Sequence, residues 1–130
     1  MIRQLINKAT AKTTKIEYIY KNNLIGYVSF FNPKKNSIET SLTKIYIYPN
    51  YRHQMFGSSI IKSSELYLNN NFGITNLSIV AWIPNNSYNK VLRFYQKNGY
   101  NHNINFKSSI YDNGYDIYDI VPLVKNISQK

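Results

Sequence analysis

The stretch of the chain best suited to chemistry is residues 45–58, where a predicted strand passes through Pro49 and a short loop into a predicted helix. A loop that opens directly into a helix presents unpaired backbone N–H groups, and the helix dipole adds partial positive charge there. Arg52 stands where a guanidinium can add a bidentate contact, and Gly57 lets the backbone approach a ligand closely. Taken together, these features indicate a loop that binds a phosphate or another anion, although most helix starts bind nothing.

Hydrophobic periodicity on either side of this loop predicts a mixed sheet with two helices. A period of two marks the strands, whereas apolar residues at i, i+1, i+4, i+7 and i+8 mark the helix after the loop. Because strand–helix–strand crossovers join parallel strands and hairpins join antiparallel ones, the sheet must contain both. The predicted fold is α/β of the mixed α+β type, in the order β-β-β-α-β-α-β-β. The expected strands are a hairpin over 15–31, residues 37–48, residues 77–83 and a hairpin of 100–111 with 115–123, and the helices are 57–71 and a segment from Tyr88 to Asn98-Gly99.

The same periods predict which side chains share a face. In the strand over 37–48, Glu39, Thr43 and Ile45 are expected on one side. Residues 77–83 are almost wholly apolar, which is typical of a strand buried on both faces. In the first helix, Glu65 falls on the polar side and is expected to be solvated.

Length and composition limit the class of protein. The 130 residues, 43% of them hydrophobic, are enough for one domain with a real core, residues 1–130. Without cysteine there is no thiol nucleophile or Cys-ligated zinc, and two histidines leave little for another metal site, so we expect no metal. No apolar run approaches the ~18 residues of a membrane span, and the start lacks the apolar segment of a secretory signal. We therefore expect a cytoplasmic protein with no membrane partner.

The positive charge has two interpretations, a binding site for a polyanion or a bias in amino-acid composition. Sixteen Lys and Arg against six Asp and Glu give a formal charge of +10, which favours polyanions. The basic residues are dispersed, however, and the abundant Asn, Lys, Ile and Tyr share A/T-rich codons. Compositional drift therefore explains the charge better than a dedicated nucleic-acid site, and we do not expect nucleic acid as a partner.

Two motifs, standing in order along the chain, point to a known family. Residues 52–57 read R-H-Q-M-F-G and follow an I-Y-P step at 47–49, while residues 91–100 read V-L-R-F-Y-Q-K-N-G-Y. The first resembles the R/Q-x-x-G-x-G/A motif of the GNAT acetyltransferase superfamily, and the second resembles that family's A-x-x-x-Y-x-K-x-G-F pattern. The resemblance implies a GNAT-like fold and direct attack of an amine on the thioester of acetyl-CoA, which is the implied co-substrate.

The resemblance also implies where acetyl-CoA binds. The backbone of Ile45, Tyr46 and Ile47 would hold the pantetheine arm, and an N–H near Ile47 would stabilise the tetrahedral oxyanion. Asn86 would bond the pantetheine or adenosine portion, or simply cap the second helix. Lys90 and Arg93 either reach the CoA phosphates or face water. The loop implied to wrap the pyrophosphate consists of Arg52, His53, Gln54, Met55, Phe56, Gly57 and Ser58.

Two residues are implied as catalytic, each with a structural alternative. Tyr95 matches the tyrosine near the CoA sulfur and would be the general acid, whereas its apolar neighbours would also suit a core position. Glu39 lies on a strand where relatives often place a carboxylate or an ordered water, so it is the candidate base, although such a residue is more often solvated.

The chain departs from the family pattern at two places. Met55 replaces the first loop glycine, so its side chain would crowd a phosphate, or lie outward if the local φ is negative. We expect this to weaken CoA binding rather than abolish it. Residues 1–15 leave no room for the helix pair that usually follows the first strand, and only residues 2–6 could supply that strand. The acceptor site should therefore be open, or completed by a second subunit in a homodimer.

Three hypotheses follow. An open acceptor face suits an N-acetyltransferase for a protein or peptide amine. A small-molecule amine acetyltransferase is the first alternative, although the basic charge disfavours polycationic acceptors. A catalytically weak CoA-binding or regulatory module is the second, motivated by Met55 and the missing helices.

Overall fold

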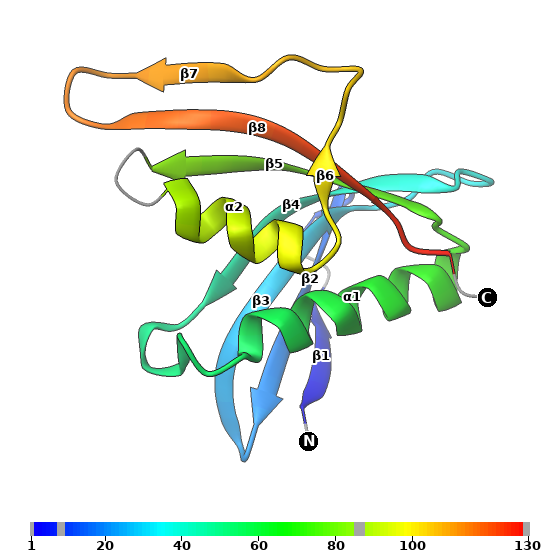
Figure 1. The fold of residues 1–130 in the computed structure, drawn as a ribbon. Coiled ribbons are helices and arrows are strands. Elements are labelled where there is room, and N and C mark those ends of the chain that lie inside the picture. Colours follow the sequence, from blue (N-terminus) through cyan, green and yellow to red (C-terminus); the bar gives the residue numbers. More distant parts are fainter. Residues whose placement is uncertain (1, 8–9, 85–87, 129–130) are drawn as a thin grey trace.

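The computed structural model describes residues 2–7, 10–84 and 88–128, which form a single sheet with two α-helices on it (Figure 1). The helices are α1 (Phe56–Phe72) and α2 (Tyr88–Lys97), and a short 3-10 helix, η1 (Pro49–Tyr51), precedes α1. The strands are β1 (Arg3–Asn7), β2 (Thr13–Tyr20), β3 (Asn23–Phe31), β4 (Glu39–Ile47), β5 (Asn76–Pro84), β6 (Asn101–His102), β7 (Ser109–Asp112) and β8 (Ile117–Asn126).

The sheet is mixed, as predicted. Its strand order is β1-β2-β3-β4-β5-β8-β6, and β7 also pairs with β8. The crossover through α1 makes β4 and β5 parallel, whereas the other pairs are antiparallel. The predicted elements are present in the predicted order; the structure adds β1 before them and divides the first arm of the last hairpin into β6 and β7. Only residues 8–12 separate β1 from β2, too few for a helix pair, which confirms the reduced N-terminal region.

Both helices cover the same face of the sheet, and the core lies beneath them (Figure 1). The predicted inner face of α1 is buried at Ile60, Ile61 and Leu68. Ser64 belongs to that face too, and its Oγ lies 2.5 Å from the Tyr18 hydroxyl on β2, so a buried hydrogen bond joins helix and sheet. In the described ranges, neither helix combines the length and the apolar character needed to cross a membrane.

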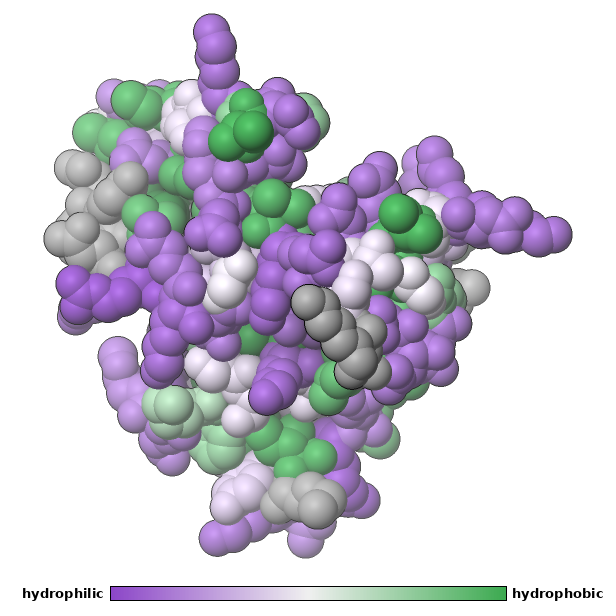
Figure 2. Space-filling view, turned by 45° about the vertical axis from the view of Figure 1, so that its right-hand side comes forward, coloured by the Kyte–Doolittle hydropathy of each residue, from purple (hydrophilic) through white to green (hydrophobic). Residues whose placement is uncertain are grey.

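Among the described residues, no helix covers the opposite face of the sheet, which we call the uncovered face. Val80 and Trp82 of β5 point to it and are 53% and 52% exposed. The prediction that residues 77–83 are buried on both sides is therefore wrong, because a helix layer is present on one side only. Figure 2 shows that hydrophobic side chains reach the surface in several separate patches between hydrophilic ones.

A β-bulge in β4 changes which side chains of that strand face the helices. Leu42 pairs with Phe30, but Ser29 pairs with Lys44, so Thr43 is an extra residue. Glu39 precedes the bulge and lies on the uncovered face, whereas Ile45 follows it and packs against the core. The prediction that Glu39 and Ile45 share a face is wrong, since strict alternation fails across the bulge.

The bulge coincides with the point where β4 and β5 separate. Their parallel pairing covers Glu39 to Leu42 on β4 and Asn76 to Ile79 on β5, and then stops. From there β4 remains paired with β3 as far as Ile47, while β5 continues along β8 to Pro84. The sheet is thus split into two diverging halves.

Gly26 keeps the far half of β4 close to β3. A Cβ at this buried glycine would run into the backbone carbonyl of Tyr46 and lie 3.1 Å from the Ile47 side chain. Since a backbone carbonyl cannot rotate away as a side chain can, any larger residue must push β4 outward.

We therefore expect Gly26→Ala to lower the free energy of unfolding by about 1–3 kcal/mol, because it overpacks a buried strand pair. Urea denaturation measures this, with Ser29→Ala on the same strand as the control, since Ser29 lies on the uncovered face. If Gly26→Ala and the control had the same free energy of unfolding, β4 would be able to move away from β3 without loss of stability.

Candidate active site

The divergence of β4 and β5 opens a cleft of about 860 Å³. Its walls come from the end of β4, the loop after it, the first turn of α1 and one side of α2. The lining residues are Ile45, Tyr46, Ile47, Tyr51, Arg52, His53, Met55, Gly57, Ser58, Lys90, Val91, Arg93, Phe94, Tyr95 and Lys97. Sequence segments that are far apart thus meet at one site, because both helices rest on the same face of the split sheet.

The backbone of β4 turns hydrogen-bonding groups into this cleft. The Tyr48 N–H donates to the Ile25 carbonyl on β3 at 3.0 Å. Successive residues of a strand direct their backbone groups to opposite sides, so the Ile47 N–H points away from β3 and toward the gap. The Ile47 carbonyl faces the same way, where it accepts a 2.8 Å hydrogen bond from Arg52 Nε. An N–H donor at Ile47 therefore lies where the resemblance implied one.

The start of α1 is built to attract an anion. Its N-cap residue, Met55, makes no side-chain capping bond, and no acidic residue stands in the first turn. The N–H groups of that turn and the positive end of the dipole consequently face the cleft without a carboxylate to neutralise them. α1 has 17 residues, and all of its turns contribute to that dipole.

The loop before α1 reaches this geometry through two residues in left-handed backbone conformation. His53 has φ of 63° and Met55 has φ of 68°, a region that favours glycine. The condition under which Met55 would lie outward, a negative φ, is therefore not met. Its side chain is nevertheless 64% exposed, and its sulfur lies 3.7 Å from Lys97 Nζ at the cleft rim.

Basic side chains line both sides of the cleft. Arg52 and His53 stand on the loop, while Lys90, Arg93 and Lys97 project from α2. The three residues of α2 are spaced i, i+3 and i+7, so they fall on one side of the helix. Five basic residues around an uncapped helix start suit a ligand that carries several phosphates.

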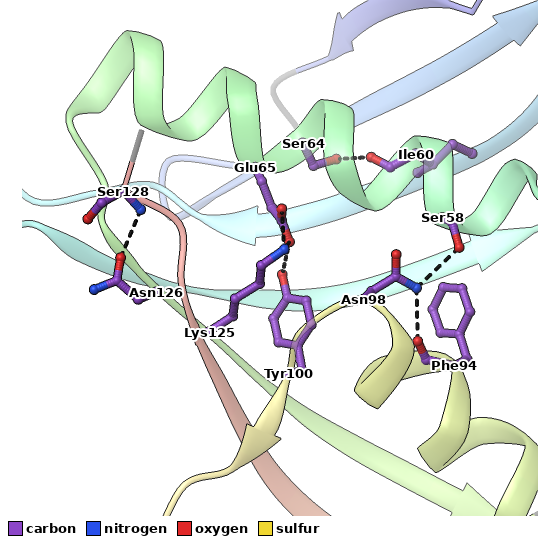
Figure 3. A network of polar contacts seen from close by, with 10 residues as sticks. All are labelled: Ser58, Ile60, Ser64, Glu65, Phe94, Asn98, Tyr100, Lys125, Asn126 and Ser128. Carbon is purple, nitrogen blue, oxygen red and sulfur yellow. Dashed lines mark hydrogen bonds and ion pairs between the residues drawn. The ribbon is translucent and has the colours of Figure 1, made fainter. Parts of the chain in front are cut away.

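Asn98 ties the end of α2 to the start of α1. Its Nδ2 donates to Ser58 Oγ at 3.2 Å and to the Phe94 carbonyl at 2.8 Å (Figure 3). A Cβ on Gly57 would stand 3.0 Å from the Phe94 ring. The sequence suggested that Gly57 makes room for a ligand, whereas the structure shows that it first makes room for α2.

Tyr95 is a partly buried titratable group that lines the cleft. Burial raises its pKa to about 12, so the hydroxyl is protonated at neutral pH. The ring packs against Tyr100, with centroids 6.2 Å apart, and the Tyr95 carbonyl accepts the Tyr100 N–H at 3.0 Å. Backbone and side-chain contacts therefore both fix Tyr95 at the end of α2.

Behind Tyr95 lies a buried polar cluster that the sequence did not predict. The Tyr100 hydroxyl donates to Glu65 Oε2 at 2.8 Å, and Lys125 Nζ donates to Glu65 Oε1 at 2.8 Å (Figure 3). Burial, and then the adjacent Glu65 carboxylate, hold the pKa of Tyr100 far above its usual value. Glu65 is 8% exposed, so the expectation that it is solvated is wrong: Tyr100 and Lys125 satisfy its charge.

Three predicted site residues do not bring their side chains into the cleft, and a fourth cannot be placed. Glu39 is exposed at the opposite end of β4, about 20 Å from Ile45 at 3.3 Å per residue, and does not line the site. Gln54 turns back to donate to the Asn50 carbonyl at 3.0 Å. Phe56 packs on Tyr20, with ring centroids 5.1 Å apart. Asn86 lies outside the described residues.

The sequence also missed contributors to the site. Tyr51 and Lys97 line the cleft, and Asn98 joins its two helices. Lys97 could have been found from its helical spacing to Lys90 and Arg93. Tyr51 and Asn98 carry no such signal, because their roles depend on tertiary packing.

Comparisons with known proteins agree with this geometry. A family model described as acetyltransferase (GNAT) domain matches residues 4–102. A search of curated proteins found no match. Among solved structures, a GNAT family acetyltransferase from Elizabethkingia anophelis with acetyl-CoA bound superposes with a TM-score of 0.72 at 19% identity, covering 96% of this chain and 97% of that one.

Two further structures with defined acceptors have the same fold. The spermidine N-acetyltransferase from Vibrio cholerae, in complex with CoA and spermine, gives a TM-score of 0.72 at 14% identity, covering 89% of this chain and 66% of that one. The ribosomal-protein-S18-alanine N-acetyltransferase from Escherichia coli gives 0.71 at 16% identity, with 95% and 74% covered. The family model spans most of the chain, and Arg52, Gly57 and Tyr95, which belong to the two sequence motifs, line the same cleft. The chain belongs to the GNAT family of acetyltransferases.

Proposed function

We propose that this protein transfers an acetyl group from acetyl-CoA to the primary amine of a protein or peptide. The observation that carries the proposal is the meeting, in one cleft, of the Ile47 N–H, the uncapped start of α1 and the protonated Tyr95 hydroxyl. These are a donor for an oxyanion, a site for a pyrophosphate and a proton donor for a leaving group. The acetyl-CoA-bound relative with the same fold supports the choice of co-substrate.

Different residues of the cleft bind different parts of acetyl-CoA. The first turn of α1, with Arg52 and His53, binds the pyrophosphate. The Lys and Arg side chains of α2 face the remaining phosphate of CoA. The pantetheine arm lies between the diverging strands and bonds to the backbone of Ile45 and Ile47. This arrangement sets the thioester beside the Ile47 N–H and Tyr95.

In the reaction, the neutral amine attacks the thioester carbonyl and forms the new C–N bond. The carbonyl oxygen becomes an oxyanion and accepts the Ile47 N–H. When the intermediate collapses, the C–S bond breaks and the Tyr95 hydroxyl protonates the departing thiolate. Among the described residues no carboxylate lines the cleft, so the amine gives its proton to water.

The first test is isothermal titration with acetyl-CoA. We expect micromolar binding by the wild type and about tenfold weaker binding by Arg52→Ala, since a charge-assisted hydrogen bond contributes about 1.5–3 kcal/mol. Arg3→Ala, on the exposed strand β1, is the matched control and should bind as the wild type does. Absence of binding at millimolar acetyl-CoA would remove the co-substrate and leave the fold alone.

A second test concerns Tyr95. We expect Tyr95→Phe to lower kcat by about 10²–10⁴-fold while acetyl-CoA binds unchanged, because the hydroxyl acts only as the thiolate leaves. In the wild type, a pKa of about 12 keeps the acid protonated, so kcat should not fall as pH rises through 10. Thiol release is measured with free-amine peptides, single-lysine peptides and spermidine as acceptors. Unchanged kcat in Tyr95→Phe would leave Tyr95 without a catalytic role.

The left-handed Met55 gives a third test. Met55→Gly removes the cost of placing a side chain at φ of 68°, about 1–2 kcal/mol in free energy of unfolding. The substitution also lets the loop backbone close on the pyrophosphate, so acetyl-CoA should bind to Met55→Gly more tightly than to the wild type. Met55→Ala keeps the Cβ and serves as the control for loss of the thioether. Weaker binding by Met55→Gly would show that the side chain itself holds the ligand.

A second candidate function is a CoA-binding module with little or no transfer. It is favoured by the position of Glu39, since the one carboxylate proposed as base lies far from the cleft. Tight acetyl-CoA binding without thiol release from any of the three acceptor classes would support it.

A further inference from the structure

We propose that the acceptor is an acidic peptide segment, bound along a row of cations and tyrosines that leads out of the cleft over the uncovered face. This deepens the proposed function and rests on it. The row, which we call the cation–tyrosine ladder, consists of Arg52, Tyr46, Lys44, Tyr27 and Lys15.

The ladder begins inside the site and continues without a break across three strands. Arg52 and Tyr46 both line the cleft, and the Arg52 guanidinium carbon lies 5.4 Å from the Tyr46 ring centre. Lys44 Nζ lies 5.5 Å from the Tyr46 ring and 5.7 Å from the Tyr27 ring. Lys15 Nζ stands 4.4 Å above Tyr27. A chain that leaves the cleft at Arg52 therefore meets Lys44 and then Lys15.

Strand register explains why these residues line up. Tyr46 pairs with Tyr27 across β4 and β3, and their rings stack with centroids 5.6 Å apart. Ser29 lies between Lys44 on β4 and Lys15 on β2, pairing with both. Without the bulge at Thr43, Lys44 and Tyr46 would lie on the same face as the buried Leu42; the extra residue turns both to the uncovered face, so the ladder depends on the irregularity that also splits the sheet.

The charge of the ladder is not neutralised within the protein. In the described ranges the one ion pair joins Lys125 to Glu65, on the other side of the sheet. Strand β2 places one carboxylate on the same face as the ladder, that of Glu17, which pairs with Tyr27. Glu39 also lies on this face, but at the opposite end of β4. Three cations against one nearby carboxylate leave an excess positive charge on the uncovered face, next to the rim of the cleft.

The chemistry of the ladder fits carboxylates better than nucleic acid bases. Base binding needs a free aromatic face, but here the two rings stack on each other and carry ammonium or guanidinium groups. An extended peptide places alternate side chains about 6.6 Å apart on one side, a spacing that suits cations carried on neighbouring strands. The same charges repel polyamines, so the acceptor should differ from that of the spermidine-acetylating relative.

The test is the binding of labelled decapeptides, measured by fluorescence anisotropy with saturating CoA. One peptide has Asp and Glu after an N-terminal Ala, the second has Asn and Gln at the same positions, and the third has Arg. The protein is compared with Lys15→Glu/Lys44→Glu and with Lys62→Glu/Lys107→Glu, whose substituted residues are exposed away from the ladder. Both double variants reduce the net charge equally, so non-specific attraction by the whole protein is controlled.

We expect the wild type to bind the acidic peptide about tenfold more tightly than the amide peptide. The ladder variant should lose this preference and favour the Arg peptide, while the control variant keeps it. Lys15→Gln/Lys44→Gln, a milder change, should lose the preference without gaining one for Arg. Acetyl-CoA titration should be unchanged in all variants, which shows that they are folded.

Three results would overturn the proposal. These are equal binding of acidic and amide peptides, an equal loss in the ladder and control variants, and ladder-dependent binding of a single-stranded oligonucleotide that is tighter than that of the acidic peptide. Failure of the proposed function is separate, because it would appear as absence of acetyl-CoA binding by the wild type while the peptide measurements still report on the ladder.

Discussion

The divergence of β4 from β5 is the constraint on which the site depends. A fully paired sheet would use the Ile47 N–H in a ladder hydrogen bond, and the strand would have nothing to offer a ligand. The extra residue at Thr43 ends the pairing, and Gly26 keeps the freed end of β4 against β3. The cleft, the direction of the Ile47 N–H and the position of Lys44 all follow from this local irregularity.

The sequence predicted those parts of the fold that depend on local pattern. The helix face around Ile60 and the loop that opens into α1 are each encoded within a few consecutive residues, and the parallel crossover follows from the order of the elements. It did not predict what depends on register or partner choice. The bulge moved Glu39 off the face of Ile45, and Glu65 was buried because Tyr100 and Lys125 arrive from distant strands. A period along one segment contains no information about either event.

The site shows the same division. The loop and the helix start after it follow from the motif at residues 52–57, whereas the left-handed φ of Met55 was not predicted and the tie between Asn98 and Ser58 arises only when α2 docks. Among the described residues no helix covers the face that carries Trp82, so this side of the sheet is a surface. The cation–tyrosine ladder lies on that surface and begins in the cleft, so strand β4 belongs both to the cleft and to the proposed acceptor surface.

The position of β8 late in the sequence determines when the sheet can be completed during synthesis on the ribosome. This strand pairs with β5, β6 and β7, yet it follows all of them in sequence. Strands β1 to β4 pair with their neighbours in sequence, so they can form as they emerge. Strand β5 lacks its second neighbouring strand until residues 117–126, which form β8, have been synthesised. Because such non-local pairing is slow, the nascent chain should expose an incomplete half-sheet late in synthesis. The cleft between the two helices and β4 should therefore be among the last features of this protein to form.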